Sequence, residues 1–73
     1  MFVSVLYYKP DMNGYAGRRY TFFTALPLVE NQKVLVPPDN QKAIVREVNL
    51  DESTIIGEPW AKNIKEITQL DIE

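Results

Sequence analysis

Every apolar run in this chain has the length of a β-strand, and turn-forming residues end each run. Residues 2–8 are apolar apart from Ser4, and their alternation predicts a strand in which Val3, Val5 and Tyr7 form the more deeply buried face. Runs this short leave no place for a long helix, except at the C-terminal end. The pattern therefore favours a small, mainly β domain.

A second strand is predicted over residues 18–24. Tyr20 and Phe22 alternate there with polar residues, so we expect both rings to point toward the core. Between the two strands, residues 9–17 collect Pro, Asp, Asn and Gly, each of which favours turns. This composition predicts a long loop.

A β-hairpin is predicted further along the chain. Residues 34–36 form a short β-branched run that ends at a Pro-Pro-Asp-Asn turn, and residues 42–49 form the returning strand. The apolar residues of the returning strand change parity, which predicts a β-bulge near Val45 and Arg46. The core is expected to contain the inward-facing residues of these strands, Val5, Phe22, Val34, Val36 and Val45.

Four strands separated by turns predict a small, antiparallel, strongly bent sheet or a partly open barrel of the SH3-like or OB-like type. The C-terminal end is ambiguous: Pro59 is acceptable at the first position of a short helix, but residues 64–72 also fit an extended chain. Because 73 residues support only one core, we expect residues 1–73 to form a single domain.

The chain contains no His and no Cys. The usual general base, the nucleophilic dyads and most transition-metal ligands are therefore absent, and we expect a non-enzymatic protein without metal, cofactor or small-molecule substrate. Small secreted domains usually need disulfides, so a reducing, cytoplasmic compartment is favoured. No apolar stretch is long enough to span a bilayer, and we expect no membrane partner.

Two predicted loops contain residue types found in ligand-binding sites, but the spacing of these residues matches no binding motif. Asp51 and Glu52, with Glu58 nearby, match no EF-hand pattern and supply few oxygens. Gly14 and Gly17 lack the lysine and the following helix of a phosphate-binding loop. Both loops are expected to be ordinary turns.

Aromatic and basic residues gather around the start of the second strand. Tyr15, Arg18 and Arg19 lie close together in sequence, and Lys9 stands across the predicted loop. Stacking rings beside guanidinium groups are typical of single-strand nucleic-acid binders, although the net charge of −2 opposes general attraction to nucleic acid. Trp60 is a possible anchor for a partner, and its alternative place is in the core.

The segment from Arg18 to Asn49 resembles the N-terminal DNA-binding domain of the primosomal replication-restart helicases. In that family an aromatic strand, a leucine-containing loop, a valine strand ending in Val-Pro, a turn and a second valine-rich strand follow one another. The matching positions are Tyr20 and Phe22, Leu26 and Leu28, residues 34–37, residues 38–41 and residues 43–48. Residues 2–8 match the opening strand, and residues 61–73 match the closing one. The resemblance implies a DNA-binding module without ATPase activity.

The chain differs from this family at two turns. It has Glu-Asn-Gln at residues 30–32 and Pro-Asp-Asn at residues 38–40, where the family has Gly and Asp, and Gly with basic residues. We therefore expect a protein-interaction or assembly module whose partner is another protein or a second copy of the chain. The alternative is a nucleic-acid-binding small barrel that uses Lys9, Tyr15, Arg18 and Arg19.

Overall fold

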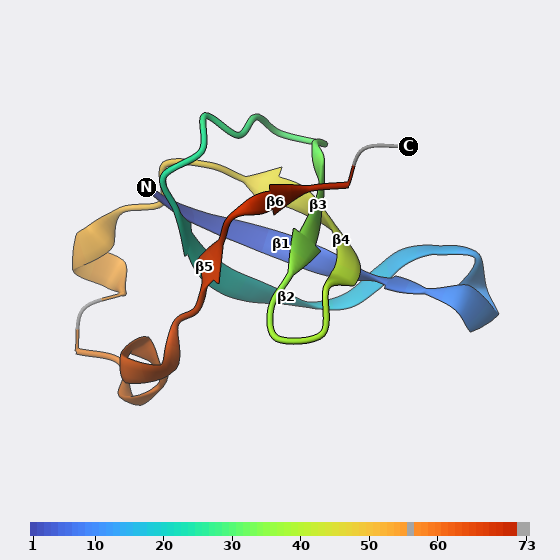
Figure 1. The fold of residues 1–73 in the computed structure, drawn as a ribbon. Coiled ribbons are helices and arrows are strands. Elements are labelled where there is room, and N and C mark those ends of the chain that lie inside the picture. The colour runs from blue at the N-terminus through green and yellow to red at the C-terminus, as the bar shows by residue number, and fades with distance from the viewer. Residues whose placement is uncertain (56, 72–73) are drawn as a thin grey trace.

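The computed structural model describes residues 1–55 and 57–71, with Trp60 and Lys62 described by their backbone only. The described strands form one sheet in the order β5-β2-β1-β4-β3-β6 (Figure 1). Their bounds are β1 Phe2–Lys9, β2 Gly14–Thr24, β3 Lys33–Val36, β4 Gln41–Glu47, β5 Glu66–Ile67 and β6 Gln69–Leu70. The mainly β prediction is confirmed.

Strands β1 and β2 form a long hairpin whose far end extends beyond the rest of the sheet (Figure 1). The prediction of a loop over residues 9–17 is wrong, because β2 already begins at Gly14 and pairs there with Lys9. The turn needs only the 3-10 helix η1 (Pro10–Met12) and Asn13, which adopts a left-handed conformation with φ 52°. Asn tolerates that conformation, so four residues suffice to reverse the chain.

Strands β3 and β4 form the predicted second hairpin. Ser4 of β1 is opposite Glu47, but its neighbour Val5 is opposite Val45, so Arg46 is one residue more than the register needs. The predicted β-bulge is confirmed at this position.

The C-terminal end combines both predicted conformations. The 3-10 helix η3 (Pro59–Asn63) comes first, and the chain is then extended through β5 and β6. β5 pairs in parallel with β2, whereas β6 pairs antiparallel with β3. The sheet is therefore mixed, and the prediction of a purely antiparallel sheet is wrong. The long connection through η2 (Glu52–Thr54) and η3 returns the chain in the direction of β2, which a short hairpin turn cannot do.

One segment, residues 66–70, thus supplies both edge strands of the strongly bent sheet (Figure 1). The core lies inside this bend, and all five residues predicted for it are at most 5% exposed. Thr24 is also fully buried; its hydroxyl donates to the carbonyl of Ile67 at 2.9 Å and accepts from the amide of Leu26 at 3.0 Å. In the described part of the chain, no helix has the length and apolar character needed to cross a membrane.

Candidate binding groove

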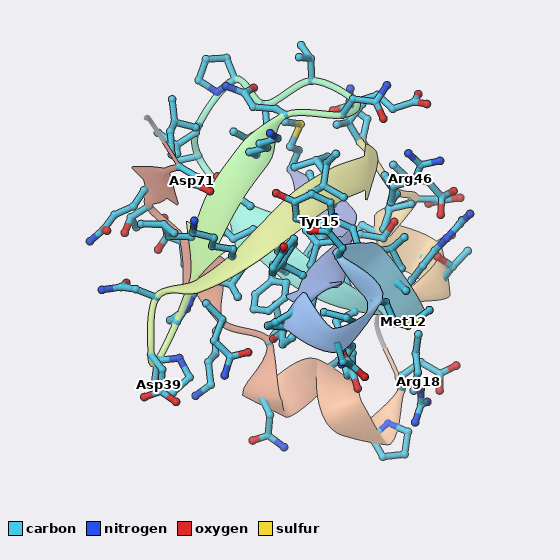
Figure 2. The ribbon with its side chains drawn as sticks, turned by 90° about the vertical axis from the view of Figure 1, so that its right-hand side faces the viewer. Met12, Tyr15, Arg18, Asp39, Arg46 and Asp71 are labelled. Atoms are coloured by element: carbon cyan, nitrogen blue, oxygen red, sulfur yellow. The ribbon has the colours of Figure 1, made fainter. Side chains whose placement is uncertain are left out.

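Tyr15 and Arg18, both in the predicted aromatic and basic cluster, lie on opposite sides of the β1–β2 hairpin (Figure 2). Tyr15 is opposite Tyr8 in the ladder, and the two rings meet edge to face with centroids 5.4 Å apart. This cross-strand pair stabilises the hairpin. Tyr15 therefore has a structural contact away from Arg18.

Arg19 forms an ion pair. Its Nη1 lies 2.6 Å from Oε1 of Glu47, and the hydroxyl of Ser4 donates to the same oxygen at 3.2 Å. Both charged side chains are about half exposed, so a pair of this kind contributes at most about 1 kcal/mol to stability. Its main effect is to neutralise the Arg19 charge on this face.

Lys9 is the last residue of β1, and its side chain reaches across the hairpin to Gly17 of β2. Its Cε would be 3.5 Å from a Cβ added to Gly17, a residue with a φ of 97° next to the register break in β2. Of the predicted cluster, the structure therefore brings Lys9 close to Gly17 and places Tyr15 and Arg19 in other contacts.

A groove of about 520 Å³ opens beside β2. One wall is formed by residues 18–22 of β2, and the others are the Pro37-Pro38 turn and residues 63–65. Tyr7 and Tyr20 line it with ring centroids 5.1 Å apart and an interplanar angle of 31°. The groove thus presents an aromatic surface that continues from the core.

Tyr20 is 44% exposed, so the prediction that it points into the core with Phe22 is wrong for this residue. The two rings lie on the same side of β2, but β5 pairs with β2 only at Phe23 and Thr24. Tyr20 therefore lies beyond the part of the strand that β5 covers.

The groove is cationic. Arg18 places its guanidinium carbon 5.9 Å from the centroid of the Tyr20 ring, within the range of a cation-π contact. Lys65 also lines the groove and is exposed. Among the described lining residues there is no Asp or Glu, and neither Arg18 nor Lys65 takes part in a described ion pair.

The Tyr7 hydroxyl stays protonated at neutral pH. Partial burial raises the pKa of Tyr7 above the usual tyrosine value, and the neighbouring Tyr20 has a smaller effect in the same direction. The groove therefore offers a neutral hydroxyl that can donate a hydrogen bond, beside two cations.

Asp51 acts as a helix cap. Its carboxylate accepts hydrogen bonds from the Ser53 amide at 3.0 Å and from the Ser53 hydroxyl at 2.8 Å. These bonds lower the pKa of Asp51, the amide bond having the larger effect. Among the described residues, no group of three or more His, Cys, Asp or Glu could hold a metal ion.

The Trp60 side chain, predicted as a possible partner anchor, lies outside the described residues. Sequence reasoning missed other groove residues, among them Tyr7, Pro37 and Lys65. No local pattern marks them, because the bend of the sheet brings together segments far apart in the sequence. No protein-family model, no curated protein and no solved structure matches the chain.

Proposed function

We propose that this chain is a non-catalytic protein-interaction module that binds a segment of another protein in the Tyr7–Tyr20 groove. The observation that carries the proposal is a groove in which an exposed aromatic ring lies beside a guanidinium group. Tyrosine and arginine are enriched in protein interfaces and at their hot spots. We also propose that the fold is a partly open small barrel of the SH3-like or OB-like type. The lack of Cys favours a cytoplasmic location.

The chemistry of the groove suits a peptide segment. Its volume of about 520 Å³ is within the usual range for ligand sites, and its walls combine Tyr, Pro and Ile side chains with cations. An apolar side chain of the partner can pack on Tyr7 and Tyr20, while a nearby carboxylate faces Arg18 or Lys65. The groove therefore favours an acidic partner segment that also carries apolar residues.

Nucleic-acid binding is the second candidate function, supported by Arg18 beside the Tyr20 ring. It ranks lower for three reasons. Arg19 is paired with Glu47, Tyr15 is packed against Tyr8, and the chain has a net charge of −2. A continuous track of free cations, which phosphate binding requires, is therefore lacking among the residues predicted to form it.

A displayed peptide library tests the proposal. We expect the wild-type protein to enrich acidic sequences that contain aromatic or aliphatic residues, and Tyr20→Ala to lose this enrichment. Tyr15→Ala is the matched control, because it also removes a tyrosine from β2 but on the other side of the hairpin; it should enrich the same sequences as the wild type.

Equal enrichment by the Tyr20→Ala and wild-type proteins would contradict the proposal. Retention on single-stranded DNA resin, with steep release by salt and no peptide enrichment, would instead support the second candidate function.

A further inference from the structure

We propose that the partner binds by strand addition: an extended acidic segment of another protein pairs with the free outer edge of β2. This inference rests on the proposed function and specifies its binding mode and the chemistry of its partner.

The hydrogen bonds at the end of β2 show which backbone groups face outward. The amino group of Met1 donates to the Thr24 carbonyl at 2.8 Å, and the Thr24 amide donates to the Met1 carbonyl at 2.9 Å. In an antiparallel ladder such pairs alternate with pairs that exchange no hydrogen bonds. Phe22 and Tyr20 therefore bond to β1, whereas the amide and carbonyl of Thr21 point away from it.

The next outward residue, Phe23, shows what a partner does at this edge. Its amide donates to the carbonyl of Lys65 at 3.0 Å, at the start of the parallel pairing with β5. Before that point the chain leaves the edge, because the Ile64 amide bonds back to Ala61 at the end of η3. In the described structure no group hydrogen-bonds to the amide of Thr21.

The groove lies along this open edge, since residues 18–22 of β2 form its wall. An added strand would pair with Thr21 and continue toward Arg18. Side chains of a strand alternate between two sides, so every second side chain of the added segment would lie on the side of the sheet that carries the exposed Tyr20 ring. Main-chain bonds would supply affinity, and the aromatic and cationic walls would supply specificity.

The charges of the groove residues indicate which kind of strand binds at this edge. A second copy of the chain paired through β2 would add its own Arg18 to an edge that already carries Arg18 and Lys65, and like charges close together across a strand pair are destabilising. A segment carrying Glu or Asp would instead meet Arg18 and Lys65 without a described acidic residue in the lining. The inference therefore commits to an acidic segment of a different protein.

Backbone methylation of a defined peptide tests strand addition. The probe is a capped peptide of about eight residues that alternates Glu and Val. Two modified forms carry N-methyl groups on either all Glu or all Val amides. Because alternate amides of a strand face opposite sides, one form should bind about tenfold more weakly than the parent and the other within about twofold.

A change at Thr21 provides the matched test on the protein. Thr21→Pro removes the outward amide and leaves the bonds to β1, while Thr21→Val keeps the amide and loses only the hydroxyl. We expect the Pro variant to bind the Glu–Val peptide about tenfold more weakly than the Val variant. If the Pro variant does not fold, the two methylated peptides decide.

Equal affinity of both methylated forms and the parent peptide would overturn strand addition while leaving the groove as a binding site. Failure of the parent peptide to bind, when the displayed library still depends on Tyr20, would overturn the acidic-strand inference alone. Failure of both would overturn the proposed function as well.

Discussion

Tyr20 and Phe22 project from the same side of β2, yet Tyr20 is 44% exposed and Phe22 only 5%. The exposed fractions differ because β5 pairs with β2 only at Phe23 and Thr24, next to Phe22, and does not extend to Tyr20. Phe22 belongs to the core, and its ring centroid is 6.5 Å from that of Tyr7. On one side of β2, the Phe22 ring is therefore packed in the core and the Tyr20 ring is exposed to solvent.

These two positions should respond differently to truncation. Phe22→Ala should cost about 3 to 5 kcal/mol, a large part of the stability of a domain of this size, because it removes a buried ring. Tyr20→Ala should cost about 1 kcal/mol, since much of its ring is already in water. Urea unfolding measures both values. A Phe22→Ala protein as stable as Tyr20→Ala would contradict the placement of the core.

The raised pKa of Tyr7 predicts a pH dependence of stability. Burial favours the neutral phenol, so this stabilisation is present below the unfolded pKa of about 10 and is lost as the pH rises through the folded value. The wild type should therefore lose more stability than Tyr7→Phe above about pH 10. Chemical unfolding across that range measures the difference. Parallel curves for the two proteins would show that Tyr7 ionises as freely in the folded state as in the unfolded one.

At the scale of elements, the long β1–β2 hairpin contains an irregularity in its register. The register between the strands shifts after the Val5–Tyr20 pair and resumes at Tyr7 and Ala16. Gly17 lies in this irregular stretch with a φ of 97°, which L side chains rarely adopt. Arg18 follows Gly17 in this irregular stretch and lines the groove.

Gly17→Ala should therefore destabilise the protein by about 1 to 2 kcal/mol and lower its melting temperature by several degrees. Gly14→Ala is the control, because Gly14 lacks a positive φ and an added Cβ would meet only the Met12 carbonyl oxygen at 3.9 Å. It should change the stability by less than about 0.5 kcal/mol. Equal melting temperatures for the two variants would mean that the positive φ of Gly17 is not conformationally demanding.

Local patterns predicted some elements and missed others for identifiable reasons. The β3–β4 hairpin and its bulge at Arg46 follow from neighbouring residues, because apolar parity and turn chemistry are both local. The extension of β2 to Gly14 depends on the cross-strand Tyr8–Tyr15 pair, which composition alone does not reveal. The parallel pairing of β5 depends on a contact between residues more than 40 positions apart.

At the scale of the whole molecule, the bend of the sheet creates the groove. Residues of β1 and β2, the Pro37-Pro38 turn and residues 63–65 meet in a sheet whose two edge strands both come from residues 66–70. Of the site, the sequence pointed to Arg18 beside an aromatic residue but not to Tyr7, Pro37 or Lys65. The chain is acidic overall, yet the described lining contains no Asp or Glu, and the proposal of an acidic partner segment depends on that contrast.

The most direct test of the groove as a protein-binding site is an amide NMR titration of the labelled protein with the capped Glu–Val peptide. We predict saturable shifts that are largest at residues 18–22 and 64–65 and small at Tyr15 and Val29, which lie outside the groove lining. No shifts, or shifts centred on Tyr15 and Val29, would contradict the account. So would groove shifts produced at low salt by a single-stranded oligonucleotide but not by the peptide.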